Sequence, residues 1–126
     1  MKWYDIFSNF YDNSLEKLYF NSRKRAVELL DLKDNQTVID IACGTGANFK
    51  HIKASNDKII LYGTDYSSGM LKKGQDSIKK NSWTNIFLFQ ADARELNLTS
   101  IEKYTNKKGC RQTIFKFVMS MLSYFL

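Results

Sequence analysis

The chain has 126 residues, of which 44% are hydrophobic and 25% charged, and its formal net charge is +6. This length and composition fit one globular domain with its own core, and they exclude an intrinsically disordered chain. The two cysteines form no metal-binding spacing, residues 1–10 lack the apolar region of a signal peptide, and the apolar run at 114–126 is too short to span a bilayer. We therefore expect a cytoplasmic protein with reduced thiols, no membrane span and no metal site.

An aromatic segment, WYDIFSNFYD, occupies residues 3–12 and precedes a predicted helix. The helix is indicated by residues that recur at helical spacing, and Asn13 or Ser14 can cap its start. The recurring residues are Leu15, Leu18, Tyr19, Ser22, Ala26, Leu29 and Leu30. We expect residues 1–35 to form an aromatic flap followed by this helix.

The stretch TVIDIACGTG follows, a β-branched apolar run that ends in an acidic residue and then breaks into a glycine-containing turn. It predicts a strand over residues 37–42 that delivers the chain to a nucleotide-like ligand. Ala42, Gly44 and Gly46 fill a G-x-G-x-G frame. Phe49, however, stands where a dinucleotide fingerprint needs its last glycine, and no P-loop lysine follows. The turn therefore suits an uncharged or zwitterionic tail better than phosphates.

A short helix is predicted over residues 47–53, with Phe49 and Ile52 on its inner face. A second apolar run, residues 58–64, predicts a strand that ends at Asp65. This acid lies about 20 residues after the glycines, the spacing at which a carboxylate receives ribose hydroxyls. The turn and the acid together predict an adenosine-containing ligand.

A longer helix is predicted over residues 68–80, with an apolar inner face and a lysine-rich outer face. The inner residues are Leu71, Gly74 and Ile78, and the outer lysines are Lys72, Lys73, Lys79 and Lys80. These lysines suit either a basic nucleic-acid-binding module or an ordinary solvated helix face, and we favour the solvated face. His51, the single histidine, sits among lysines, and we expect it to face solvent.

Residues 86–90 predict a third strand and residues 113–120 a fourth. Strands and helices that alternate at this length predict an α/β, Rossmann-like fold with an open, mainly parallel sheet and right-handed crossovers. The carboxyl ends of the first three strands would meet at one edge of the sheet, where ligands bind in such folds. The sequence therefore predicts a ligand site at that edge.

The residues at this edge resemble the motifs of the class I S-adenosylmethionine-dependent methyltransferases. The likeness is closest to the small-molecule and quinone or phospholipid methyltransferases that carry D-x-[AG]-C-G-T-G. Asp40, Gly44 and Gly46 match the first motif, Asp65 the second, and Asp92 with Ala93 the third. The resemblance runs over residues 3–97. Ala42 replaces the first family glycine, a change that is tolerated where φ is negative, as we expect it to be.

The resemblance implies how the chain would hold S-adenosylmethionine. The glycine turn would lie along the methionine part, with Cys43 as a small packing residue inside it, and Asp40 would orient the turn and the cofactor's amino end. Asp65 would bind the ribose, unless it only caps the following helix. Asp92 would accept from the adenine amino group while the amide of Ala93 donates to the ring, unless that acid only caps a turn.

Aromatic residues and Met70 complete the expected cofactor and substrate contacts. Tyr66 and Met70 would either cover the adenosine or pack under the helix. Tyr4 and Tyr11, each followed by an aspartate, resemble an element that closes over the cofactor; the alternative is a flap that caps the core. Because methyl transfer to a good nucleophile needs positioning more than acid-base chemistry, no catalytic residue is predicted. The acceptor would be a small molecule or a lipid-like compound.

The carboxyl end departs from the family. The family sheet normally has seven strands, whereas this chain offers at most four, and Lys116 stands where relatives usually carry an acid. We expect a single domain, 1–126, with a cofactor-binding core at 36–97 and a divergent or truncated tail at 98–126. The last strand would leave an apolar edge that a homodimer could cover. Three functions stay open: an active methyltransferase, a degenerate or truncated cofactor-binding paralogue without turnover, and the basic module.

Overall fold

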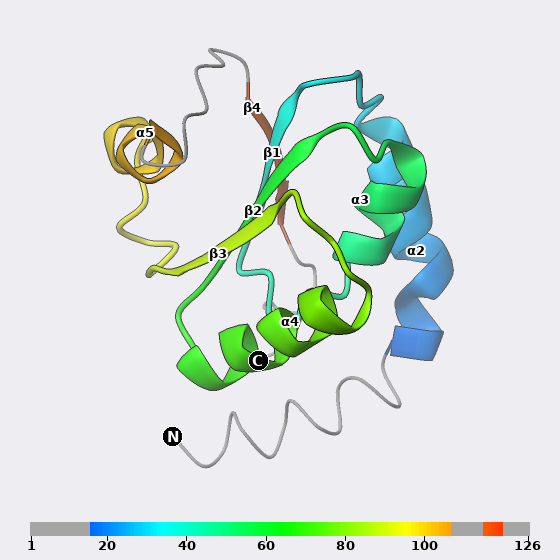
Figure 1. Ribbon diagram of the computed structural model, residues 1–126, viewed down its shortest axis with the longest axis horizontal. Coiled ribbons are helices and arrows are strands. Elements are labelled where there is room, and N and C mark those ends of the chain that lie inside the picture. Colours follow the sequence, from blue (N-terminus) through cyan, green and yellow to red (C-terminus); the bar gives the residue numbers. More distant parts are fainter. Residues whose placement is uncertain (1–15, 107–114, 120–126) are drawn as a thin grey trace.

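A computed structural model describes residues 16–106 and 115–119 of the chain (Figure 1). Helices and strands alternate along the described residues. In chain order they are α2 (Glu16–Leu29), β1 (Thr37–Ile41), α3 (Phe49–Ser55), β2 (Ile60–Asp65), α4 (Ser68–Lys80), β3 (Ile86–Gln90), α5 (Leu98–Asn106) and β4 (Phe115–Met119). Every predicted strand is confirmed, and so are the predicted helices, with α3 beginning two residues later than expected.

The four described strands form one sheet in the order β3-β2-β1-β4, and every neighbouring pair is parallel. Thr37 of β1 lies level with Ile60 of β2 on one side and with Phe115 of β4 on the other. The predicted α/β, Rossmann-like open sheet is therefore confirmed. The carboxyl ends of β1, β2 and β3 lie side by side in it.

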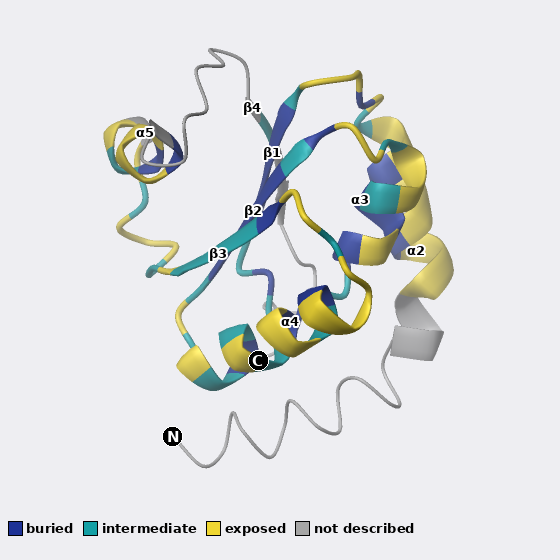
Figure 2. Cartoon of the chain, in the orientation of Figure 1, coloured by how far each residue is buried: buried dark blue, intermediate teal, exposed yellow. Residues whose placement is uncertain are grey.

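Alternate residues of the central strands point to opposite faces of the sheet, as strand geometry requires. Val38 and Leu61 belong to a buried cluster that also contains residues of α2, α3 and α4. Ile39 and Tyr62 belong to a second cluster, with Ile101 of α5. Helices thus cover both faces, and β1 and β2 are the most deeply buried elements (Figure 2).

Helix α5 is an element that the sequence analysis did not predict. Asn97 caps it: the Ser100 amide donates to Asn97 Oδ1 at 2.9 Å, and the Asn97 amide donates to Ser100 Oγ at 3.1 Å. This reciprocal pair is a capping box built on Asn-x-x-Ser instead of the usual glutamate or glutamine. Ile101 and Thr105, one turn apart, are buried against the sheet. The capping pair and the buried stripe are the two sequence signals that could have found α5.

The buried face of α2 differs from the one that the apolar spacing indicated. Of residues 20–29, Arg23 and Val27 are buried, whereas Ser22, Ala26 and Leu29 are exposed. This part of the helix is therefore oriented by its contact with α3 and by a polar link from Arg23 to the residue before α3.

Lys116, the departure noted in β4, ties this edge strand to α2. Its Nζ donates to the carbonyl oxygen of Leu30 at 2.8 Å, immediately after the last residue of α2. A cation is favoured at this end of a helix because the last carbonyls have no partner within the helix. The lysine therefore stabilises the end of α2 and places β4 against it. Within 16–106 and 115–119, no helix is long and apolar enough to cross a membrane.

Candidate functional site

The turn between β1 and α3 bends through three left-handed residues: Ala42 at φ +56°, Gly44 at +59° and Gly46 at +87°. Our expectation of a negative φ at Ala42 is therefore wrong. The amide of Cys43 donates to the carbonyl of Thr64 at 2.9 Å, which holds the chain against β2 while it reverses direction. An alanine in this conformation is strained by about 1–2 kcal/mol. Such strain is typical of functional turns that the surrounding structure holds in place.

The surroundings of Gly44 and Gly46 differ, and they explain a glycine at position 46 but not at position 44. A Cβ on Gly46 would collide with the ring of Phe49, so this glycine allows α3 to pack on the turn. A Cβ on Gly44 would meet no atom within 4 Å. Packing within the described chain therefore does not explain Gly44, and its bare backbone can be approached from outside.

Asp65, at the end of β2, fastens the glycine turn to the start of α4. Its Oδ2 accepts from the amide of Gly44 at 2.9 Å, and its Oδ1 accepts from the amide of Ser67 at 2.8 Å. Ser67 is the N-cap of α4, and its hydroxyl accepts from the amide of Met70 at 3.2 Å. A carboxylate has about four lone-pair positions, so two remain for a ligand after these two bonds.

Asp40 is fully buried beneath the turn and belongs to a line of polar side chains. Its Oδ1 accepts from Asn48 Nδ2 at 3.5 Å, and Asn48 Oδ1 accepts from Arg23 Nη1 at 3.2 Å. The Oδ2 of Asp40 has no hydrogen-bond partner within residues 16–106 and 115–119. Burial raises the pKa of this carboxyl to about 7; the Asn48 hydrogen bond and the Arg23 charge oppose that rise, and the charge of Asp65 adds to it.

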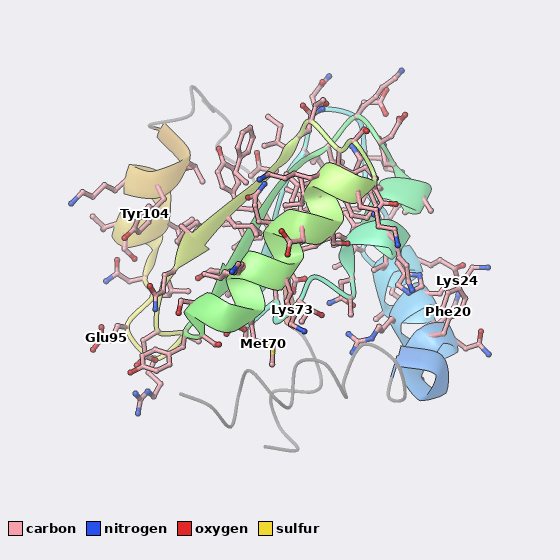
Figure 3. The ribbon with its side chains drawn as sticks, turned by 60° about the horizontal axis from the view of Figure 1, so that its bottom comes forward. Phe20, Lys24, Met70, Lys73, Glu95 and Tyr104 are labelled. Carbon is pink, nitrogen blue, oxygen red and sulfur yellow. The ribbon has the colours of Figure 1, made fainter. Side chains whose placement is uncertain are left out.

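Arg23 is a site residue that the sequence analysis did not find. It stands in a charged stretch of α2, SRKR, and nothing in the local pattern separates it from its neighbours. The structure does separate it, because Lys24 and Arg25 are exposed whereas Arg23 is only 4% exposed. In Figure 3, Lys24 and Phe20 mark the side of the sheet on which α2 lies, and Tyr104 of α5 marks the other.

Asp92 follows β3 and lies at the same edge of the sheet as Asp65. The amide of Ala91 donates to the carbonyl of Asp65 at 3.1 Å, which continues the pairing of the two strands past their ends. The Asp92 carboxylate forms an ion pair with Arg94, whose Nη2 lies 2.6 Å from Oδ2. Hydrogen bonds from the side chain and the amide of Arg94 lower the pKa of Asp92 to about 2. Asp92 is therefore ionised at neutral pH, and Ala93 beside it is exposed.

The remaining predicted cofactor residues divide between surface and interior. Tyr66 is 64% exposed, and Met70 is 5% exposed. Cys43 is a buried free thiol whose pKa is raised well above its ordinary value, first by burial and then by the charges of Asp40 and Asp65. A thiol in such surroundings behaves as a small packing group and not as a nucleophile. Tyr4 and Tyr11, with the aspartates that follow them, lie outside the described residues.

His51 does not face solvent, so that expectation is wrong. Its side chain is buried, and its ring packs edge to face against Phe20 of α2, with the ring centroids 4.7 Å apart and the planes at 72°. The lysines around it in the sequence misled the prediction, because α2 covers this face of α3.

The fold and the site define the class of protein. The profile of the family described as "Methyltransferase domain" matches residues 38–105, which include β1, the glycine turn, Asp65 and Asp92. The chain belongs to this family, and the predicted resemblance to class I S-adenosylmethionine-dependent methyltransferases is confirmed.

Individual relatives match this chain over only part of their own length. The demethylmenaquinone methyltransferase of Desulfitobacterium hafniense is 31% identical over 97 residues, which are 75% of this chain and 37% of that protein. The 23S rRNA (uracil(1939)-C(5))-methyltransferase of Francisella tularensis subsp. novicida is 33% identical over 72 residues, or 57% of this chain and 16% of that protein. The chain thus spans well under half the length of these relatives.

Solved structures show the same fold. A putative S-adenosyl-L-methionine-dependent methyltransferase from Methanococcus maripaludis superposes with a TM-score of 0.62 at 17% identity, over 75% of this chain and 43% of that one. The likeness extends to the arrangement of strands and helices described above.

Proposed function

We propose that the carboxyl edge of the sheet binds S-adenosylmethionine, and that the chain is the cofactor-binding part of a methyltransferase. The observation that carries this proposal is the surroundings of Gly44. A Cβ there would meet no atom of the described residues within 4 Å, while the amide of the same residue donates to the carboxylate of Asp65. An open stretch of backbone beside a fixed carboxylate is what a nucleoside ligand with an extended tail requires.

The charge of the edge supports a ligand of this kind. Asp40, Asp65 and Asp92 all lie at the carboxyl ends of neighbouring strands, in a chain with a net charge of +6. Carboxylates repel phosphates and attract ammonium and sulfonium groups. The edge therefore suits the ammonium and sulfonium groups of a zwitterionic tail and disfavours the pyrophosphate of a dinucleotide.

Each residue has a binding or orienting role in this proposal. Asp65 would receive the ribose hydroxyls on its two remaining lone pairs, Asp92 and the Ala93 amide would read the adenine edge, and Asp40 would orient the turn. Tyr66 lies at the same edge, where it can cover the nucleoside. When bound, the cofactor supplies a methyl group on a sulfonium that carries its own leaving group. Positioning and exclusion of water are then the main contributions left to the protein.

The acceptor that we propose is a small molecule or a lipid-like compound. One relative is named for a demethylated quinone and another for a ribosomal RNA uracil, so relatives of this domain differ in acceptor. Tyr4 and Tyr11 are our candidates on the substrate side. We also propose that β4, the last strand in the sheet order, pairs with a second copy; a monomer by light scattering at high concentration would contradict this.

Calorimetric titration of S-adenosylmethionine into the full chain tests the cofactor site with three variants. Gly44→Ala places a methyl group where the ligand would approach, yet Ala42 shows that this turn holds an alanine at a similar φ. We expect Gly44→Ala and Asp65→Ala to lose binding at least tenfold, with the fold retained by circular dichroism. Asp57→Ala, an exposed acid in the loop before β2, is the control and should bind like the wild type.

The outcomes separate the open functions. Binding that is lost in Gly44→Ala but kept in Asp57→Ala supports the site and justifies a screen of methyl acceptors. Binding without turnover on any acceptor favours a degenerate paralogue. A folded wild type that does not bind would refute the proposal, and steeply salt-dependent binding to random RNA that ignores Asp65→Ala would favour the basic module.

A further inference from the structure

A line of three buried polar residues leads from α2 to the glycine turn: Arg23, Asn48 and Asp40, which we call the buried polar chain. Arg23 and Asn48 are each 4% exposed, and Asp40 is 0% exposed. They come from three elements: α2, the N-cap position of α3, and β1. Burying polar groups of this kind is unfavourable unless they are hydrogen-bonded, so their position requires a reason.

The hydrogen bonds determine which way the Asn48 amide points. Its Oδ1 accepts from the Arg23 guanidinium, which can only donate, and its Nδ2 therefore faces Oδ1 of Asp40. The opposite orientation would place the amide NH₂ against the guanidinium. Arg23 thus acts on Asp40 in two ways: through its charge, and through the direction in which it holds Asn48.

The second oxygen of Asp40 has no partner among residues 16–106 and 115–119. Within that part of the chain, Oδ2 is buried and accepts no hydrogen bond. An ionised carboxylate in that state is costly, so the carboxyl keeps its proton to a higher pH than an exposed aspartate unless a positive charge or a donor comes near. The glycine turn begins two residues after Asp40, so a positively charged group of a ligand lying along the turn would supply such a charge.

Within the described part of the chain, the groups that bear on the ionisation of Asp40 come from α2, β2, the turn and β4. Arg23 of α2 favours the ionised carboxyl, whereas Asp65 at the end of β2 disfavours it. In the turn, the Cys43 thiol is neutral, because burial raises its pKa well above the ordinary value. From β4, Lys116 lies level with Val38, and its Nζ donates to the Leu30 carbonyl. Among the residues that the structure describes, Arg23 is therefore the cation that favours ionisation of Asp40 before a ligand binds.

We propose that binding of the cofactor's ammonium-bearing tail along the glycine turn expels the proton of Asp40, and that Arg23, acting through Asn48, is the positioning residue that sets the pH of this exchange. The O–H bond of Asp40 breaks, its proton passes to solvent, and the ligand's positive charge compensates the carboxylate. The inference rests on the proposed function and adds a proton-linked step to it.

Calorimetry in two buffers with different heats of ionisation measures the protons released on binding. Titration of S-adenosylmethionine into the full chain should release about half a proton at pH 7, more at pH 6 and almost none at pH 9, since the free carboxyl has a pKa of about 7. Below pH 7, the affinity for S-adenosylmethionine should increase with rising pH, by up to about tenfold per pH unit, because binding releases a proton. The ligand's own amino group also titrates near pH 8. Asp40→Asn keeps that contribution and is therefore the reference that is subtracted.

Substitutions of Arg23 distinguish its proposed role from a structural one. Arg23→Met should move the midpoint of the proton release upward by about 1 pH unit, because the opposing charge is lost. Arg23→Lys keeps the charge and should restore the midpoint. A merely structural role would weaken binding equally at every pH and leave the midpoint unchanged, which would overturn the assignment of Arg23.

The remaining outcomes are separable. Binding whose proton release is the same in the wild type and in Asp40→Asn would overturn the coupling and leave the cofactor site standing. A folded wild type that binds nothing at any pH would overturn both. If Asp40→Asn does not fold, a ¹³C-carboxyl titration of Asp40 in the wild type makes the same measurement. The midpoint must then fall when S-adenosylmethionine is added, and an unchanged midpoint would refute the coupling.

Discussion

The buried carboxyl of Asp40 makes the stability of the protein depend on pH, and Asp40→Asn should remove that dependence. In the folded chain the pKa of this group is raised from 3.8 to about 7, with burial as the main cause. The unfolded chain releases the proton near pH 4, whereas the folded chain keeps it to about pH 7. Between these values folding takes up a proton, so stability falls as the pH rises.

The size of the effect follows from the two pKa values. Each pKa unit corresponds to about 1.4 kcal/mol, so the whole interval from 3.8 to about 7 is worth at most about 4 kcal/mol. About 3 kcal/mol of this change in the free energy of unfolding falls between pH 5 and pH 8. That is a large part of the 5–15 kcal/mol by which a typical domain is stable. Asparagine has nearly the same shape as the protonated acid and carries no titrating proton. The free energy of unfolding of Asp40→Asn, relative to the wild type, should therefore rise by about 2–3 kcal/mol over this range.

Urea unfolding of both proteins at pH 5, 6, 7 and 8 measures this difference directly. Subtraction of the two stability–pH curves removes the contribution of the other titrating groups, provided that both proteins have the same dependence of unfolding free energy on urea concentration. A difference that stays constant from pH 5 to pH 8 would refute the argument. It would mean that water or a group outside 16–106 and 115–119 solvates the carboxyl.

Three further predictions concern the turn, the edge strand and the ion pair after β3. Ala42→Gly should stabilise the protein by about 0.5–1 kcal/mol in urea unfolding, because relief of about 1–2 kcal/mol of strain exceeds the added entropy of the unfolded glycine. Lys116→Met should destabilise it by about 1–2 kcal/mol, because the Leu30 carbonyl loses a charged donor. Arg94→Gln should raise the pKa of Asp92 from about 2 toward 3.8 in a ¹³C NMR titration, because the guanidinium donors and their charge are removed while the hydrogen bond from the backbone amide stays.

Matched variants control these three predictions. Lys103→Met removes an exposed lysine of α5 and should leave stability nearly unchanged; an equal loss in both lysine variants would show that Lys116 contributes only net charge. Gly46→Ala should destabilise strongly because its Cβ would collide with Phe49, and stabilisation there would contradict the turn geometry. Lys80→Gln removes a distant charge, so a similar shift of the Asp92 pKa in that variant would argue against a specific pair.

Local sequence patterns predicted most of the secondary-structure elements of the fold. The β-branched run before the glycines, the apolar run that ends at Asp65 and the spacing of Leu71, Gly74 and Ile78 each predicted an element that the structure contains. Each signal lies within the residues of one element, because hydrophobic periodicity along that element indicates which of its faces is buried. The parallel arrangement then followed from alternation, and with it the edge at which the candidate site lies.

The amino-acid sequence by itself thus determined the strands and the described helices other than α5, the family and the acids at the sheet edge. Only the tertiary structure decided the left-handed Ala42, the burial of His51 and the separate reasons for Gly44 and Gly46. It also selected Arg23 from a charged run and joined Lys116 to Leu30, contacts that span 25 and 86 residues of sequence. Such contacts depend on which surfaces meet after the sheet has formed. The spacing of neighbouring residues does not encode them.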